Sequence, residues 1–284
     1  SRRSVKKDGD ISITALYTAQ AWIFAGVENA ALFADKDAKR VFDVTNLALA
    51  GAGLFRRDLP VLRCSLAQRH AMIDFAVRGS GATQVLEIAS GLSPRGATFS
   101  SDPLLRYVEL DLPSMVLRKR ALLARSAAGR GVLDRPGWSL VADDARTVDL
   151  AALLEADRPA CIVAEGLLPY LPAAEQRALW ARVAAALRRA GSGTLIFDLT
   201  PGPELPRPGV AGRGLRALMK RFTGGRSFEE DGRSRAEILG ELAAAGFTDG
   251  EALEPGPLLD AWQLPFPEAR TQVVLFRTRY VREG

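Results

Sequence analysis

Hydrophobic residues recur along the chain at two different spacings, and the spacing changes near residue 83. Before this point apolar residues follow one another at three- and four-residue steps, as at Leu16, Ala19, Trp22 and Ile23. This spacing places them on one face of a helix. The pattern therefore predicts a helical amino-terminal segment over residues 1 to 82.

Beyond residue 83 the pattern changes to short apolar runs separated by helical stretches. Five runs read TQVLEIA, RYVELDL, GWSLVAD, ACIVAEG and GTLIFDL. Short continuous apolar runs are typical of strands buried on both faces of a parallel sheet. We expect helices over residues 113 to 126, 149 to 156 and 172 to 190. Strands alternating with helices predict a doubly wound, Rossmann-like α/β sheet.

Two further segments complete the predicted domain organisation. Residues 83 to 200 are predicted to form the α/β core. Residues 201 to 235 are rich in Pro, Gly and Arg and break the alternation, so we predict a cap or lid insertion there. Residues 236 to 284 are predicted to add one helix and the closing strands of the core, with residues 248 to 254 as a partner strand.

Composition and charge argue against membrane, secreted and nucleic-acid-binding proteins. The chain has 284 residues, of which 48% are hydrophobic and 25% charged, enough for one large core. No run of about eighteen apolar residues occurs, and the opening SRRSVKKDGD lacks the apolar stretch that a secretory signal needs, so we expect a cytoplasmic protein without membrane contact. The net charge is +5, but the arginines are scattered and not flanked by aromatic residues. We therefore do not expect nucleic-acid binding.

Cysteine and histidine are scarce. Cys64 and Cys161 lie in apolar contexts far apart in the sequence, so we expect two buried free thiols. With His70 as the one histidine, we expect no metal site built from cysteine and histidine.

The residues with a candidate role in chemistry follow the predicted strands. Glu87 ends the first run and leads into a turn with Gly91, while Asp111, Asp144 and Glu165 follow at or beside the ends of the next three. Ligands of open α/β sheets bind at the carboxyl ends of the strands. Asp111 lies twenty residues after Gly91, where an acid can accept hydrogen bonds from ribose hydroxyls. The constellation predicts a nucleotide-like ligand.

At this point the sequence resembles a known family, the leucine carboxyl methyltransferase-like group, which includes O-methyltransferases of polyketide and other natural-product pathways. The resemblance lies in VLEIASGLSPRG, YVELDLP followed by RKR, DDAR, and AEGLLPYLP, over about residues 60 to 200. It implies a class I methyltransferase fold and S-adenosylmethionine as cofactor. The first turn departs from the family pattern of two glycines and an acid, since it has Ala89, Gly91 and Ser93.

The resemblance also implies roles for individual residues in cofactor binding. Asp111 would hold the ribose, and Gly91 would lie against the methionine part. Asp144 and Ala145 would flank the adenine. Glu165 would face the amino group of the cofactor, and Arg69 would pair with its carboxylate.

Four of these candidates have a second interpretation. Glu87 either takes part in the cofactor site or only orients the glycine turn. Arg69 is either a carboxylate clamp or a surface partner of Asp74. His70 is a candidate general base, although a lone histidine is more often structural. Tyr170 either lines the acceptor pocket, as a second candidate catalytic residue, or packs in the core.

Two other segments resemble known motifs but lack a residue that each motif requires. LALAGAGLF has Arg56 where a dinucleotide fingerprint requires a third glycine, and it lies in a helical tract. GLSPRG has Arg95 where a hydrolase elbow requires glycine two residues after the serine.

The sequence therefore predicts S-adenosylmethionine-dependent O-methylation of a small natural product, on a carboxylate or on a phenol or other hydroxyl. A carboxylate needs no base, whereas a phenol with a pKa of ~10 benefits from one. The alternatives are carbon methylation or cyclisation on the same fold, or a non-catalytic module that binds the cofactor. The acceptor and the oligomeric state are not predicted.

Overall fold

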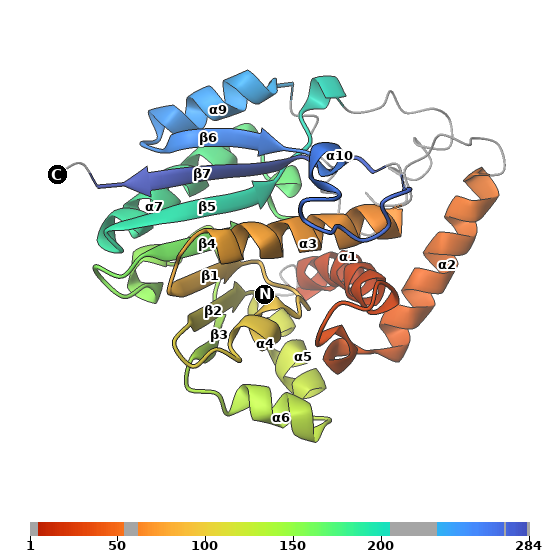
Figure 1. Ribbon diagram of the computed structural model, residues 1–284. Helices are drawn as coiled ribbons and strands as arrows, with labels where there is room; N and C mark the ends of the chain where they lie inside the picture. Colours follow the sequence, from red (N-terminus) through yellow and green to blue (C-terminus); the bar gives the residue numbers. More distant parts are fainter. Residues whose placement is uncertain (1–4, 54–61, 205–231, 270, 283–284) are drawn as a thin grey trace.

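Seven strands form one sheet in the order β3-β2-β1-β4-β5-β7-β6 (Figure 1). The computed structural model describes residues 5–53, 62–204, 232–269 and 271–282. Strands β1 to β5 run parallel, and β7 runs antiparallel to β5 and β6. Their bounds are β1 (Gln84–Ile88), β2 (Arg106–Asp111), β3 (Trp138–Ala142), β4 (Ala160–Ala164), β5 (Ser192–Asp198), β6 (Thr248–Leu253) and β7 (Leu275–Val281).

The five predicted strands and the two closing strands are thus confirmed, and so is the doubly wound α/β fold. The order places β1 between β2 and β4, so the chain reverses its direction of travel across the sheet after β3. The carboxyl ends of β1 and β4 meet at this switch point, where open α/β sheets bind their ligands.

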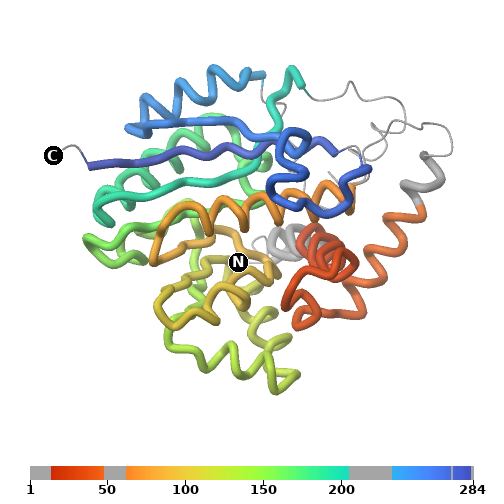
Figure 2. The backbone as a smooth tube through the Cα atoms, viewed as in Figure 1, coloured from red at the N-terminus to blue at the C-terminus, as the bar shows by residue number. Residues whose placement is uncertain are grey.

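The amino-terminal segment is helical as predicted. It consists of α1 (Val5–Phe24), the short 3₁₀ helix η1 (Ala30–Phe33), α2 (Lys36–Gly53) and α3 (Leu62–Gly79). Helix α3 crosses the front of the sheet in Figure 1, and α1 and α2 lie beyond the edge to which the β5 arrow points. The backbone trace in Figure 2 shows the same placement. These helices therefore lie beside the carboxyl ends of the parallel strands.

Further helices follow the strands. They are α4 (Arg95–Phe99), α5 (Pro113–Leu123), α6 (Ala127–Leu133), η2 (Leu150–Leu153), η3 (Leu168–Tyr170), α7 (Ala173–Arg189), η4 (Gly202–Glu204), α9 (Arg235–Ala244) and α10 (Pro255–Leu258). The prediction of helix over residues 172 to 190 is confirmed.

Two other helix predictions are wrong in extent. The single helix expected over residues 113 to 126 is two helices, because the Ser126 side chain accepts a hydrogen bond from the Gly129 amide and caps a second helix. The helix expected over residues 149 to 156 is one 3₁₀ turn, capped by Asp149 and followed by extended backbone at Leu154.

The core lies on both faces of the sheet because successive strand residues point to opposite sides. In β1, Val85 belongs to the hydrophobic cluster that includes residues of α1, α3 and α5, whereas Leu86 and Ile88 belong to the cluster that includes residues of α7 and α9. Glu87 therefore points to the same face as Val85, toward α3. This alternation sends one acid of β1 into a buried layer.

Several further expectations can be compared with the structure. Cys64 and Cys161 are buried free thiols, as predicted. Residues 205 to 231 of the predicted lid lie outside the described residues, so the lid and the domain boundaries stay predictions. Within the part of the chain that the structure describes, we find no helix with the length and apolar character needed to cross a membrane.

Candidate functional site at the carboxyl ends of the parallel strands

The turn after β1 is tied to the end of β2 by Asp111. The Gly91 amide donates to Oδ2 of Asp111 over 2.6 Å, and the Leu112 amide donates to Oδ1 over 2.7 Å. Ala89 and Gly91 both have positive φ, at 55° and 51°. This conformation is uncommon for alanine and readily adopted by glycine. The turn therefore depends on its glycine and on the Asp111 carboxylate.

Asp111 keeps the capacity to bind a ligand in this position. A carboxylate has about four acceptor sites, of which the two backbone amides use two. Burial raises the pKa of Asp111 above its ordinary value, although both amides act in the opposite direction. The side chain is half-buried at the sheet edge, which suits an acid that accepts hydrogen bonds from hydroxyl groups.

Helix α1 passes directly over the glycine turn. A Cβ placed on Gly91 would lie 3.6 Å from the Ala15 Cβ. Ala15 of α1 therefore covers the turn that carries Gly91.

The end of β3 brings Asp144 and Ala145 to the same edge. The Asp143 amide donates to the Asp111 carbonyl over 3.0 Å, which fixes this end next to β2. The Arg146 side chain donates to both carboxylate oxygens of Asp144, and Arg182 donates to the Ala145 carbonyl over 2.6 Å. The two candidate adenine-binding residues are thus held by Arg146, which follows them in the sequence, and by Arg182 of α7.

Arg69 of α3 lies between the ends of β4 and β5. Its Nε donates to Glu165 over 2.9 Å, and one terminal nitrogen donates to Asp198 over 3.0 Å. Asp198 also accepts from the Gly166 amide over 2.5 Å. A Cβ on Gly166, where φ is 67°, would lie 3.3 Å from the other terminal nitrogen of Arg69. Arg69 does not pair with Asp74, so the surface ion pair considered as its alternative is not formed.

Arg95 is the centre of a larger buried cluster. Its guanidinium donates to Asp74 over 2.5 Å, to Glu87 over 2.5 Å and to Glu165 over 2.8 Å. The Arg95 side chain is fully buried, and these acids come from α3, β1 and the end of β4. The three carboxylates raise the pKa of Arg95 well above its usual value against the effect of burial. Arg95 therefore joins three elements at the switch point.

We call the connected residues Arg69, Arg95, Asp74, Glu87, Glu165 and Asp198 the arginine cluster. Each of the four carboxylates contacts one or both of the two guanidinium groups, so the six side chains together carry a formal net charge of −2 when all are ionised. Burial disfavours the ionised form of Glu165, but Arg69 and Arg95 lower its pKa well below the ordinary range. Burial raises the pKa of Asp198 above its ordinary value, although Arg69 and the Gly166 amide act in the opposite direction. An excess of buried negative charge suits a ligand that carries positive charge.

Glu87 is bound entirely by protein groups in this arrangement. One carboxylate oxygen accepts from Arg95 and the other from the Tyr107 hydroxyl over 2.8 Å. The side chain is 1% exposed. This geometry favours the interpretation that Glu87 orients the turn through Arg95, and its contact with a cofactor stays a prediction.

His70 and Tyr170 lie beside the cluster. The His70 ring is buried against Trp22, with centroids 4.7 Å apart, and its Nδ1 lies 2.9 Å from Arg95 and 3.2 Å from Glu165. These contacts favour the structural interpretation of His70. Tyr170 is hydrogen-bonded to Thr14, and burial raises the pKa of its phenol. A phenol that ionises less readily is a poor general base at neutral pH.

Sequence reasoning missed Arg95 and Asp198. Arg95 entered only as the residue that breaks a hydrolase elbow, yet an arginine four residues after a strand-end glycine was available as a signal. Asp198 ends the fifth apolar run, GTLIFDL, in the same way that acids end the earlier runs. The pattern of an acid at or near the end of each strand therefore includes the fifth strand, and it would have identified Asp198.

The sequence is similar to those of known methyltransferases. A family model of the leucine carboxyl methyltransferases matches residues 19–184, more than half of the 284-residue chain. A relative from Mycobacterium avium (strain 104), assigned by name to the S-adenosyl-L-methionine-dependent methyltransferases, is 36% identical over 123 residues, 43% of this chain and 39% of the relative. The tetracenomycin polyketide synthesis O-methyltransferase TcmP of Streptomyces glaucescens is 27% identical over 114 residues, 40% of this chain and 38% of that protein. The chain thus spans about two fifths of the length of these two relatives.

Solved structures show the same fold. An O-methyltransferase family protein from Burkholderia thailandensis aligns with a TM-score of 0.51 at 14% identity, over 90% of this chain and 63% of that chain. The mitomycin 7-O-methyltransferase MmcR aligns with a TM-score of 0.50 at 18% identity, over 92% and 60%. These two structures show that the chain shares the fold of O-methyltransferases, and the matched family model shows the family to which it belongs. By that match, the chain belongs to the leucine carboxyl methyltransferase family.

Proposed function

We propose that this protein transfers the methyl group of S-adenosylmethionine to an oxygen atom, carboxylate or hydroxyl, of a small natural-product acceptor. The observation that carries the proposal is the arrangement of Arg69, Glu165 and Asp198 at the switch point, beside a turn held by Asp111. The family membership and the O-methyltransferase TcmP among the relatives support it.

The cofactor fits the charges of the site. It carries a positive sulfonium, a positive amino group and a carboxylate. The arginine cluster has two negative charges in excess, and Arg69 keeps a terminal nitrogen that no acid among the described residues engages. Glu165 and Asp198 would thus attract the amino group while Arg69 binds the carboxylate through its planar guanidinium.

The other half of the cofactor fits the ends of β2 and β3. Asp111 would accept hydrogen bonds from the ribose hydroxyls with the acceptor sites that its two amides leave open. Asp144 and Ala145 would flank the adenine, and Gly91 would lie against the methionine part. The positive φ and missing side chain at Gly91 allow that approach.

When bound, the cofactor supplies an activated methyl group. The chain must then align an acceptor oxygen with the sulfur–methyl bond and keep water away. Helix α1 contributes to both tasks because Ala15 covers the turn that carries Gly91. Tyr170, beside Arg69 and Asp198, would line the acceptor side of the site.

The first test is calorimetric titration of the purified protein with S-adenosylmethionine and with S-adenosylhomocysteine. We expect both to bind, and Asp111→Ala to weaken binding by about 1 to 3 kcal/mol through the loss of hydrogen bonds to a buried group. Asp134→Ala is the matched control, because Asp134 is an exposed acid before the amino end of β3. Folded wild-type protein that binds neither compound would refute the proposed function. Binding without methyl transfer to any acceptor would favour the non-catalytic alternative.

A further inference from the structure

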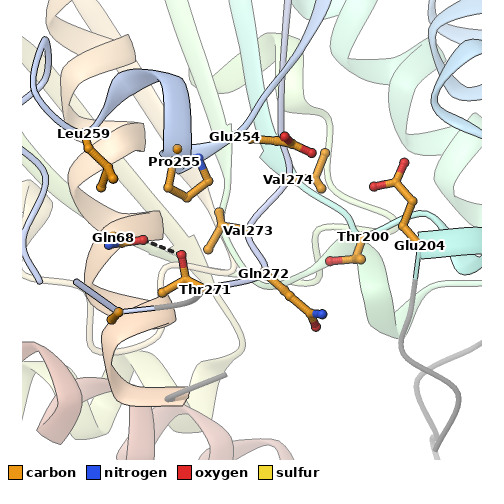
Figure 3. A pocket seen from close by; sticks show the side chains of 12 residues that line it. Gln68, Thr200, Glu204, Glu254, Pro255, Leu259, Thr271, Gln272, Val273 and Val274 are labelled. Atoms are coloured by element: carbon orange, nitrogen blue, oxygen red, sulfur yellow. Dashed lines mark hydrogen bonds between the residues drawn. The ribbon is translucent and has the colours of Figure 1, made fainter. Parts of the chain in front are cut away.

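A pocket of about 380 Å³ is lined by residues of α3, of α10, of the chain after β5 and of the chain before β7 (Figure 3). Its lining includes Gln68, the residue before Arg69 on α3, and Thr200, two residues after Asp198. The pocket is therefore lined by residues next to Arg69 and Asp198 in the sequence, together with α10 and the chain before β7. Its volume lies in the range of small-molecule sites. The proposed cofactor contacts use none of its lining residues.

One wall of the pocket is fixed by a buried amide. The Gln68 side chain donates to the carbonyls of Pro265 and Phe266 over 2.9 and 3.1 Å, and its oxygen accepts from the Thr271 hydroxyl. Gln68 is fully buried, so these bonds replace those that water would make. The chain before β7 is thereby anchored to α3, which fixes this wall of the pocket.

The pocket combines an apolar surface with uncharged polar groups. Leu259, Val273 and Val274 supply the apolar part, while Thr200 and Gln272 supply a hydroxyl and an amide. In Figure 3 the Thr200 side chain lies on the opposite side of the pocket from Leu259. Such a lining suits a molecule with an apolar body and a few hydroxyl or carbonyl groups.

The charged lining residues are both acids. Glu204 and Glu254 line the pocket, and Arg235 from the start of α9 binds both of them. One arginine for two carboxylates leaves one negative charge, and the described lining residues include no lysine or arginine. An anionic ligand would meet repulsion here, whereas an uncharged ligand would not.

We propose that this pocket holds the methyl acceptor, and that the acceptor is an uncharged molecule with an apolar, ring-sized body that receives the methyl group on a hydroxyl. The inference rests on the proposed function and narrows its acceptor from carboxylate or hydroxyl to hydroxyl. In the reaction the hydroxyl oxygen bonds to the methyl carbon as the sulfur–carbon bond breaks. The bonding electron pair goes to sulfur, and the hydroxyl proton passes to water.

The test compares two matched probes, 2-naphthol and 2-naphthoate, which differ in charge at neutral pH but share the ring system. Their affinities for protein saturated with S-adenosylhomocysteine are measured by ligand-observed NMR. We expect wild-type protein to bind 2-naphthol more tightly than 2-naphthoate. With labelled S-adenosylmethionine, we expect the methyl ether of 2-naphthol to form faster than the methyl ester of 2-naphthoate.

Three variants, one of them a control, test whether 2-naphthol binds in this pocket. Gln272→Trp fills the pocket from an exposed position and should abolish 2-naphthol binding, whereas Leu104→Trp, before the amino end of β2, should leave it unchanged. The double variant E204Q/E254Q should improve 2-naphthoate binding by about three- to tenfold and leave 2-naphthol unaffected.

The outcomes separate this inference from the proposed function. Tighter binding of 2-naphthoate by wild type, no binding of 2-naphthol, or full binding of 2-naphthol by Gln272→Trp would each overturn the pocket assignment. Calorimetry with S-adenosylhomocysteine on the same samples tests the cofactor independently. A protein that binds this compound but fails the naphthol test keeps the proposed function and loses only the pocket.

Discussion

Glu87 of β1 and Glu109 of β2 lie directly opposite each other in the sheet register and point to the same face. Both are buried, at 1% and 0% exposure, so two like charges share one apolar layer. Each is bound by a different cation: Arg95 from α4 binds Glu87 as well as Asp74 and Glu165, and Lys119 from α5 binds Glu109. The pairing of two strands thus depends on two helices that bring charge to the sheet.

The first prediction concerns Lys119, which is 1% exposed and also donates to the Ser93 carbonyl over 2.8 Å. Lys119→Met should destabilise the protein by about 3 to 5 kcal/mol, because it leaves Glu109 buried without its cation. The free energy of unfolding in urea measures this loss. The double variant K119M/E109Q also removes the negative charge of Glu109, so it should recover part of the lost stability. Equal stability of K119M and wild type would show that the pair does not stabilise the fold.

The second prediction concerns Gly96, where a side chain would overlap the Glu109 carboxylate and lie 2.8 Å from the Trp138 ring nitrogen. Gly96→Ala should cost about 1 to 3 kcal/mol, as overpacking of a buried layer does. Gly131→Ala is the control, since Gly131 lies in α6 with open space around it. That variant should gain about 0.5 to 1 kcal/mol from helix propensity. Thermal unfolding that ranks the two variants in the opposite order would contradict the packing at Gly96.

The third prediction concerns Arg69 and the part of the ligand that it recognises. Arg69→Met should weaken binding of S-adenosylhomocysteine by about 1.5 to 3 kcal/mol, or roughly 10- to 150-fold, through the loss of charged hydrogen bonds. Methylthioadenosine lacks the amino-acid part, and its affinity should stay unchanged. If both ligands weaken equally, Arg69 supports the fold of the site and does not bind the carboxylate. Circular dichroism checks that the variant is folded.

The fourth prediction concerns pH and Asp111, whose pKa burial raises above the ordinary value. The ionised form accepts the ribose hydrogen bonds, so affinity for S-adenosylhomocysteine should be constant near neutral pH. It should fall as the pH is lowered through the pKa of Asp111. Calorimetry in steps down to the lowest pH at which the protein stays folded measures this dependence. In Asp111→Asn the loss of affinity on acidification should be smaller, and an unchanged pH profile would assign the titration to another group.

Much of the fold followed from apolar patterns because strands buried on both faces leave a clear signal. The runs around β1 to β5 were found within one or two residues of their ends. The errors came from local capping, as at Ser126, where a side-chain hydrogen bond starts a new helix within a continuous helical pattern. Such bonds depend on single atoms and leave no periodicity in the sequence.

The candidate site was predicted less evenly. Asp111, Asp144 and Glu165 lie at the expected sheet edge, because strand ends fix their position. The partners of Glu165 were harder to foresee, since Arg69 and Arg95 reach it from elements that are 96 and 70 residues away in sequence. The placement of the helices over the sheet decides which arginine binds which acid. The hydrophobic pattern of the sequence predicts the helices but not where each one packs.

The pocket beside α10 draws nearly all of its walls from residues 200 to 274, whereas Arg69, Asp111, Asp144 and Glu165 lie within the family match at residues 19–184. In the proposed site, the acceptor pocket and the cofactor contacts are therefore encoded by different stretches of the gene. Mutations in the later stretch can change the shape of the pocket without altering Arg69, Asp111, Asp144 or Glu165. An engineer seeking new acceptors would randomise positions such as Leu259 and Gln272 and leave the first two thirds of the chain untouched.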